Sequence, residues 1–265
     1  MEKTRVVVPW HNSEQLERFL EAWGVTTDDP RIIFQHDRDL EGCAVTKNKG
    51  VEMARSYGAE VAIVLDDDCF PSEGQTLEAF ISAHEEALEP QEVNMFEVVT
   101  DPPSRGTPYF NRTITMPVAA SMGFWLGIGD YDAPGQLVHG AKKPMKFKRK
   151  AIYSRYFPLC GMNLAFHTSE WPWCKFIDVP RFDDIWQGFI WQRKAYSEGK
   201  CFNLAGPIVE HSRQSNVWRN LREESVNLER NETIWQEVHH MPLSSHSQMV
   251  ESLMPKPTMT GKESR

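Results

Sequence analysis

The first 65 residues alternate between short apolar runs and amphipathic runs, and this alternation limits the fold most strongly. The apolar runs at 5–8, 31–35 and 60–65 are typical of buried strands. Between them, residues 14–24 and 46–58 read as helices that each end at a glycine, and the first of them gathers its apolar residues on one face. Alternating strands and helices with continuous apolar strands predict an α/β fold, in which helices cover both faces of a parallel sheet.

Three aspartates, Asp66, Asp67 and Asp68, directly follow the third apolar run. Ligands of open α/β sheets bind at the carboxyl ends of the strands. Adjacent carboxylates repel one another unless a cation lies among them, and Mg²⁺ and Mn²⁺ prefer oxygen ligands. In an extended chain, residues i and i+2 face the same side. We therefore expect Asp66 and Asp68 to share Mn²⁺ or Mg²⁺ beside a diphosphate, with Asp67 pointing elsewhere; a solvated turn is the alternative.

A histidine near the end of the chain is a third candidate ligand for this metal. His211 follows the late apolar segment "PIVE". A neutral imidazole at a strand end would complete the coordination of a divalent ion. The alternative for His211 is a hydrogen-bonded histidine without a metal.

Composition excludes some classes of function. The net charge of −8 and the pI of about 5.6 give no general attraction to nucleic acid or to anionic membranes. No stretch is long and apolar enough to span a bilayer, and the first residues lack the apolar core of a signal peptide. The five cysteines form no C-x-x-C pair, which favours free thiols. We expect a cytoplasmic protein.

The rest of the chain is less regular. Residues 181–199 open with two aspartates and read as a helix, and 201–212 read as one late strand followed by a turn. Residues 142–150 hold a basic run, "KKPMKFKRK". We expect a single domain over 1–245, with a nucleotide-binding half at 1–90 and a sugar or acceptor half at 91–245. Residues 246–265 are polar and are expected to form a flexible tail.

Five short motifs resemble one family in order and approximate spacing. These motifs are "LDDDCF", "GDYDAPGQLV", "CGMNLAF", "RFDDIWQG" and "HSRQSN". Together they resemble the reversibly glycosylated polypeptides, which are UDP-arabinopyranose mutases related to the GT-A glycosyltransferases. The resemblance implies a GT-A-type, Rossmann-like mixed sheet flanked by helices. It also implies a UDP-sugar substrate and a divalent metal.

The resemblance assigns nucleotide-binding roles to residues of the first half. It places Asp66 and Asp67 by the diphosphate and Asp37 by the nucleoside. Further contacts are expected at the end of the first strand, at the start of the second helix and in the sugar pocket. These residues are Pro9, His11 and Asn12 for uracil or ribose, Lys47 or Asn48 for uracil or phosphate, and Trp125 for the sugar. A solvated helix face for Lys47 and core packing for Trp125 are the alternatives.

The resemblance also suggests catalytic residues. Asp183 and Asp184 match the family's second acidic pair, which would act as general base or hold an acceptor hydroxyl. Capping of the following helix is the alternative role, and which of the two acts is open. The family's sugar-carrying arginine lies between "DYDAP" and "CGMNLAF". Arg149 and Arg155 are the arginines of that interval here, in a shorter and more basic context.

Three functions follow from these residues. The first is a metal-dependent UDP-sugar mutase that interconverts pyranose and furanose forms of a UDP-pentose. The second is a glycosyltransferase that passes the sugar to a glycan, a protein or a hydroxymethylated DNA base, held by the basic run 142–150. The third is a binding protein without catalysis, which the intact aspartate run disfavours. No membrane partner is expected, and a homo-oligomer is left open.

Overall fold

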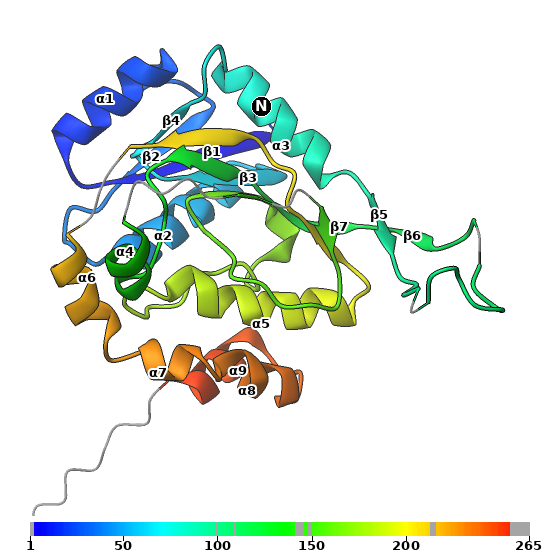
Figure 1. The fold of residues 1–265 in the computed structure, drawn as a ribbon. Coiled ribbons are helices and arrows are strands. Elements are labelled where there is room, and N and C mark those ends of the chain that lie inside the picture. The colour runs from blue at the N-terminus through cyan, green and yellow to red at the C-terminus, as the bar shows by residue number, and fades with distance from the viewer. Residues whose placement is uncertain are drawn as a thin grey trace, which may run out of the picture.

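The first half of the computed structural model has the predicted alternation of strands and helices (Figure 1). The structure describes residues 3–98, 100–108, 110–140, 146–147, 150–212 and 216–254. The first elements are β1 (Thr4–Trp10), α1 (Ser13–Trp23), β2 (Ile32–His36), α2 (Cys43–Ser56) and β3 (Val61–Leu65). Strand β1 pairs in parallel with both β2 and β3, so this part of the prediction is confirmed.

The complete large sheet is mixed, with strand order β2-β1-β3-β10-β7-β11-β9. Strand β10 (Asn163–His167) runs antiparallel to β3 and β7 (Val118–Met122), and β11 (Cys201–Asn203) runs parallel to β7. Short β9 (Ala151–Ile152) ends the sheet, antiparallel to β11. The predicted α/β class with a mixed sheet between helices is confirmed.

Helices cover both faces of this sheet. In Figure 1, α1 and α3 (Leu77–Leu88) lie on one side, and α2 and α5 (Asp183–Ser197) lie on the other. Glycine permits the close approach of α2, because a Cβ on Gly50 would clash with the Val7 side chain of β1. Phe19 of α1 packs instead against Phe34 of β2, on the opposite face. The largest buried cluster therefore fills both sides of the sheet.

Smaller elements complete the fold. Strands β4 (Cys69–Pro71), β12 (Ile208–His211) and β8 (Phe124–Gly127) form a second sheet in the order β4-β12-β8. Strands β5 (Gln91–Asn94) and β6 (Thr113–Met116) form an antiparallel pair on an arm that projects from the body (Figure 1). The remaining helices are α4 (Ala133–His139), the 3₁₀ turn Thr168–Glu170, α6 (Val217–Glu224), α7 (Leu228–Asn231), α8 (Ile234–His240) and α9 (His246–Leu253).

Two sequence-based expectations differ from the structure. Residues 201–212 form two strands in different sheets rather than one, because the buried Gly206–Pro207 step interrupts them and Pro207 has no amide to continue a ladder. The expected flexible tail begins with a helix, α9. Its Met249 and Leu253 are fully buried in a second core with α5 and α8. The burial of these side chains offsets the loss of conformational entropy when this segment becomes ordered. Residues 255–265 lie outside the described part.

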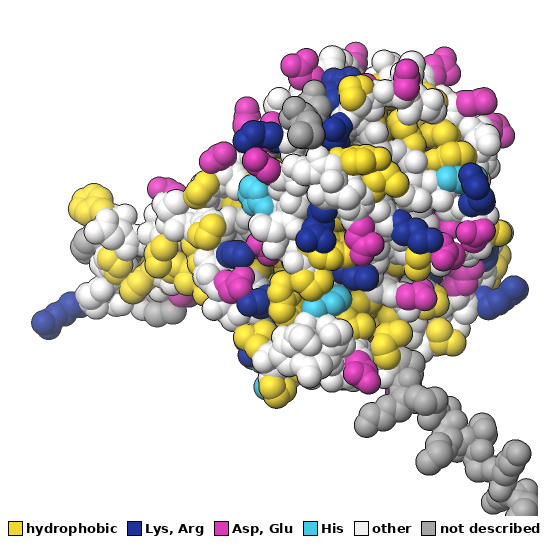
Figure 2. Space-filling view, turned by 180° about the vertical axis from the view of Figure 1, so that it is seen from behind, with side chains coloured by type: hydrophobic (Ala, Val, Ile, Leu, Met, Phe, Trp, Pro, Cys, Tyr) yellow, Lys and Arg dark blue, Asp and Glu magenta, His cyan; other side chains and the backbone are white. Residues whose placement is uncertain are grey.

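The surface has mixed character. In Figure 2, basic and acidic side chains are interspersed over the face shown, and apolar side chains are exposed between them. Among the described helices, none has both the length and the apolar composition to cross a bilayer.

A buried histidine joins α3 to the sheet. The ring of His84 is fully buried, with Nδ1 3.1 Å from Ser121 Oγ and Nε2 2.8 Å from Asn163 Oδ1. The Asn163 amide also donates to the Pro207 carbonyl oxygen at 2.9 Å. Because Asn163 Oδ1 can only accept, Nε2 of His84 carries the proton. Burial lowers the pKa of His84 to about 4, so the ring is neutral at pH 7.

We predict an acid-sensitive component of stability from His84. The folded-state pKa lies below the unfolded value of 6.5, so this component is full above pH 6.5 and is lost as the pH falls toward 4. The loss is about 3 kcal/mol of the free energy of unfolding. Urea denaturation from pH 4 to 7.5 should show a flatter pH dependence for His84→Gln than for the wild type. Equal slopes for His84→Gln and the wild type would contradict the assignment.

Candidate functional site

Two adjoining hollows lie at the carboxyl ends of the central strands. The first, here the β1 hollow, has a volume of about 380 Å³ and is lined by Pro9, His11, Asp37 and the three aspartates that follow β3. The second, the α5 hollow, has about 400 Å³ and is lined by Lys47, Trp125, Asp183 and Asp184 among others. Both are lined by Cys43 and Asp66, so they meet at the end of β3.

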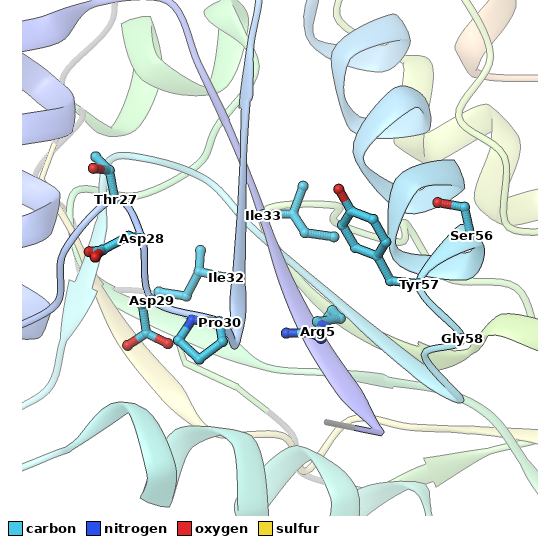
Figure 3. Close-up of a pocket in the computed structure, with 10 residues that line it drawn as sticks. All are labelled: Arg5, Thr27, Asp28, Asp29, Pro30, Ile32, Ile33, Ser56, Tyr57 and Gly58. Atoms are coloured by element: carbon cyan, nitrogen blue, oxygen red, sulfur yellow. The ribbon is translucent and has the colours of Figure 1, made fainter. Parts of the chain in front are cut away.

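Another hollow lies at the opposite end of the parallel strands. It has a volume of about 710 Å³ and is lined by Arg5, Ile32 and Tyr57 among others (Figure 3). None of the residues that the sequence marks as functional lines it. Because ligands of such sheets bind at the carboxyl ends of strands, we place the functional site at the β1 and α5 hollows.

The aspartate run forms a turn rather than an extended segment. The amide of Cys69 donates to the Asp66 carbonyl oxygen at 3.0 Å, which closes the turn and starts β4. All three aspartates line the β1 hollow, so the i, i+2 argument does not separate Asp67 from Asp66 and Asp68 here. The reason is that the i, i+2 alternation applies only to an extended chain.

Asp68 and His211 face each other across the small sheet. His211 pairs with Cys69 in the β12–β4 register, and its Nε2 lies 3.8 Å from Asp68 Oδ2. Its Nδ1 lies 2.8 Å from the Ile128 carbonyl oxygen, which fixes the proton on Nδ1 in the neutral ring. Burial lowers the pKa of His211, but Asp68 and the Ile128 carbonyl more than offset this, and the net pKa is raised.

The predicted metal ligands are only partly brought together. Asp68 and His211 adjoin, whereas Asp66 turns to Lys47. Within the described residues, no group of three or more His, Cys, Asp or Glu side chains is arranged to hold a metal ion. The chemistry of Asp68 and His211 still suits a divalent ion, because a carbonyl-oriented imidazole presents Nε2 beside a carboxylate. The metal stays a prediction.

Lys47 lines the α5 hollow. Its ammonium is buried and lies 2.8 Å from Asp66 Oδ1 and 3.1 Å from the Gly161 carbonyl oxygen. Burial alone would lower the pKa of Lys47, but Asp66, Asp183 and Asp184 raise it well above its usual value. Lys47 is therefore charged and links the end of β3 to the start of α5. This buried position differs from the solvated helix face that was the alternative for Lys47.

The acidic pair occupies the first turn of α5 and lines the same hollow. Asp184 Oδ2 accepts a hydrogen bond from the Gly161 amide at 2.7 Å. Burial and the neighbouring Asp183 raise the pKa of Asp184 to about 7, and Lys47 only partly opposes this. The pKa of Asp183 is also raised, chiefly by burial. A carboxyl group that titrates near pH 7 can both accept and donate a proton under working conditions.

Two predicted nucleotide contacts are engaged in structural hydrogen bonds. Asn12 caps α1, and its Oδ1 accepts from the amides of Glu14 and Gln15. The side-chain amide of Asn48 pairs with both backbone groups of Phe176, at 2.8 and 2.9 Å. Neither asparagine lines the β1 or α5 hollow.

Other predicted residues are divided between the hollows and positions outside them. Asp37 lines the β1 hollow, where its carboxylate accepts from the amides of Glu41 and Gly42 and shapes the loop before α2. Trp125 lines the α5 hollow and also belongs to the core, so its core packing does not exclude it from the hollow. Arg155 lies outside both hollows. Arg149 and much of the basic run 142–150 fall outside the described residues.

The hollows also contain residues to which the sequence assigned no individual role. Trp10, inside the stretch 9–12 that was expected to border the nucleoside, lines the β1 hollow and stacks on His36, with ring centroids 4.0 Å apart. Arg181 lines the α5 hollow, and its Nε donates to Glu224 Oε1 at 3.2 Å. Glu224 is buried and also accepts from the Ala133 amide at 2.7 Å. The DYDAP motif signalled part of this site, since residues 130–132 line the α5 hollow.

Comparison with known proteins gives a consistent family match. A family model described as reversibly glycosylated polypeptide matches residues 52–263. A probable UDP-arabinopyranose mutase 1 of Pisum sativum is 30% identical over 191 residues, covering 65% of this chain and 51% of the relative. UDP-arabinopyranose mutase 3 of Arabidopsis thaliana is 30% identical over 192 residues, with the same coverage. The chain spans about half the length of the curated relatives it matches.

Solved structures give weaker likenesses. S. aureus TarS 1-349 in complex with UDP-GlcNAc has 13% identity and a TM-score of 0.46, over 90% of this chain and 71% of TarS. A197 from STIV has 13% identity and a TM-score of 0.36, over 80% of this chain and 82% of A197. These values are too low to add to the family assignment.

Proposed function

The chain belongs to the reversibly glycosylated polypeptide family, and we propose on this basis that it is a UDP-sugar enzyme of the mutase type. The proposed reaction interconverts the pyranose and furanose forms of a UDP-pentose. One observation carries the proposal: the aspartate turn after β3 and the acidic pair of α5 meet at the carboxyl end of the sheet, joined through the buried Lys47. The relatives named as UDP-arabinopyranose mutases support the choice of substrate class.

We assign UDP to the β1 hollow and the pentose to the α5 hollow. Pro9, His11 and Asp37 of the β1 hollow would border the nucleoside, and Trp10, which stacks on His36, adds aromatic surface there. The shared edge at Cys43 and Asp66 supports a position for the diphosphate between nucleoside and sugar. Trp125 and the DYDAP residues would then surround the pentose.

A divalent ion fits the residues on the diphosphate side of this arrangement. Asp68 and His211 would hold it, with Asp66 nearby, and when bound it would neutralise the charge of the departing diphosphate. Lys47 keeps the Asp66 carboxylate oriented in the absence of other ligands. Mn²⁺ or Mg²⁺ is the expected ion because carboxylate oxygens suit these cations.

The acidic pair has a defined task in this reaction. The anomeric C–O bond to UDP breaks, the ring oxygen changes from the C5 oxygen to the C4 oxygen, and the anomeric carbon then rejoins UDP. One sugar hydroxyl therefore gains a proton and the other loses one. Asp184 titrates near pH 7, so this carboxyl group suits both transfers, and the Gly161 amide holds it in place.

The proposal predicts a pH dependence of the exchange rate. Asp184 has a raised pKa of about 7, so its carboxylate form, which accepts the proton, increases as the pH rises through 7. The rate constant kcat should rise by up to about tenfold between pH 6 and pH 8, and the midpoint belongs to the coupled pair with Asp183. Asp184→Asn should abolish this rise. A rate that falls over the same range would contradict the role of the carboxylate.

Incubation of the protein with UDP-arabinopyranose and Mn²⁺ tests the function directly. Formation of UDP-arabinofuranose without added acceptor, followed by chromatography or NMR, supports the mutase. Release of free UDP together with a labelled acceptor supports the second candidate, a glycosyltransferase. That candidate is favoured by one observation, a further hollow next to the α5 hollow. Nucleotide binding without any turnover would contradict both enzyme proposals.

A further inference from the structure

A further hollow adjoins the α5 hollow. This aromatic hollow has a volume of about 470 Å³, within the range of small-molecule sites, and is lined by Ser154–Pro158, Phe189, Trp235 and His239. Pro158 lines both the aromatic hollow and the α5 hollow. On α5, Ile185 lines the α5 hollow and Phe189 lines the aromatic hollow. These two residues are four positions apart, which is about one helical turn, or about 6 Å along the helix axis.

We propose that the aromatic hollow binds the sugar ring of a saccharide that accepts the pentose. The proposal rests on the assignment of the pentose to the α5 hollow and adds an acceptor subsite to it. A hydroxyl group of the bound saccharide would attack the anomeric carbon as the bond to UDP breaks. The proton of that hydroxyl would pass to the acidic pair of α5, and UDP would leave.

The wall of the aromatic hollow is fixed in the unbound protein. The side-chain amide of Gln192, fully buried in α5, pairs with both backbone groups of Phe157, at 2.9 and 3.0 Å. The Tyr196 hydroxyl donates to the Arg155 carbonyl oxygen at 2.6 Å, and the Tyr153 hydroxyl donates to the Tyr196 carbonyl oxygen at 3.3 Å. These bonds hold residues 153–157 along α5. A ligand would therefore bind to a segment that is already ordered, at a small cost in conformational entropy.

The ring geometry favours a sugar over a planar base. Tyr156 meets Phe189 and His239 edge to face, at 88° and 84°, and meets Trp235 at 49°. None of these three rings is parallel to the ring of Tyr156, so Tyr156 cannot sandwich a flat ring with any of them. The indole of Trp235 is 40% exposed and offers one apolar face, on which the C–H face of a sugar ring can stack.

Polar groups at the rim of the aromatic hollow can form hydrogen bonds with the hydroxyl groups of a sugar. Within the described chain, the hydroxyls of Ser154 and Tyr156 and the ring of His239 have no hydrogen-bond partner. The Arg155 guanidinium is exposed, and among the described residues it forms an ion pair with Glu97, at 3.8 Å. A few polar groups around an apolar surface match the two-sided character of a sugar ring.

Backbone strain marks the same three hollows. Among the described residues, the non-glycine residues with positive φ are Leu40, Ser154 and Arg181, at 53°, 60° and 66°. Leu40 lines the β1 hollow, Arg181 the α5 hollow and Ser154 the aromatic hollow. Strained conformations of this kind gather at functional sites, which groups the aromatic hollow with the other two.

The experiment measures binding of three methyl glycosides, of xylose, glucose and galactose, to the full chain by ligand-observed NMR with UDP and Mn²⁺ present. We expect at least one glycoside to bind with a millimolar Kd. Trp235→Ala should weaken this binding at least tenfold, and Tyr156→Phe, which removes only one hydroxyl, about fivefold. Trp218→Ala is the matched control, because Trp218 is an exposed helical tryptophan outside the hollows. It should leave Kd unchanged.

The binding of UDP separates this proposal from the proposed function. If wild type binds UDP but no glycoside, or if Trp235→Ala binds the glycoside normally, the acceptor subsite is overturned and the UDP-sugar function stands. Binding of thymidine or benzyl alcohol at Trp235 without any glycoside would also overturn it. If UDP does not bind to the wild type, the proposed function itself fails.

Discussion

Asp68→Asn is expected to lower the rate of pyranose–furanose exchange at least about 100-fold while the fold stays intact. Asp68 is buried beside His211 at the edge of the β1 hollow, where the diphosphate of the substrate is proposed to lie. Asparagine keeps the shape of the side chain but removes its charge. The turn itself depends on the backbone, since the Asp68 carbonyl oxygen accepts from the Ser212 amide at 3.0 Å.

The measurement compares kcat of wild type and variant at saturating UDP-arabinopyranose over a range of Mn²⁺ concentrations. Circular dichroism and urea midpoints should agree between the two proteins. Asp178→Asn is a suitable control, because Asp178 is exposed and lines neither the β1 nor the α5 hollow. Full activity of Asp68→Asn would remove this carboxylate from the proposed site.

Lys47→Met is expected to reduce the free energy of unfolding by about 3–5 kcal/mol, the range for breaking a buried ion pair on one side. The substitution keeps an apolar stem of similar length. It leaves the Asp66 carboxylate without its cation, and the nearby Asp183 and Asp184 lose the same compensating charge. It also removes the hydrogen bond to the Gly161 carbonyl oxygen, which joins α2 to the segment before β10.

Urea denaturation at pH 7.5 gives the free energies. Lys49→Met, two residues along α2, is the control, because Lys49 pairs with Glu41 on the surface and its loss should change stability little. Adding Asp66→Asn to Lys47→Met removes the charge that the first change left unpaired. The double variant should recover part of the lost stability. Equal destabilisation by Lys47→Met and Lys49→Met would contradict the role of Lys47.

The regular half of the fold was predictable and the other half was not. Strands β1, β2 and β3 are apolar runs bounded by helices with clear periodicity, so their type and parallel pairing follow from local pattern. Strands β9 and β11 have two and three residues, too few for any period to show. Helix α9 looks polar in sequence, and its two fully buried side chains meet α5 only in the folded chain.

The candidate site shows a similar division. The carboxylates of Asp66–Asp68 and Asp183–Asp184 were predictable, because the first group follows an apolar strand, the second opens a helix, and each matches a motif. Asn12 and Asn48 were ambiguous, since an asparagine amide serves equally as a cap, a backbone clamp or a ligand contact. The Arg181–Glu224 pair joins residues 43 positions apart, and no local pattern relates them.

The short connection between β11 and β12 sets the position of His211. Gly206 and Pro207 are buried there, and a Cβ on Gly206 would lie 2.8 Å from the Gly123 amide nitrogen. A strand shifted by one residue turns every side chain to the other face of its sheet. We therefore expect insertions and deletions in homologues to be rare between Asn203 and Ile208 and frequent in the projecting β5–β6 arm. An alignment of homologous sequences would then show which chains keep His211 beside Asp68.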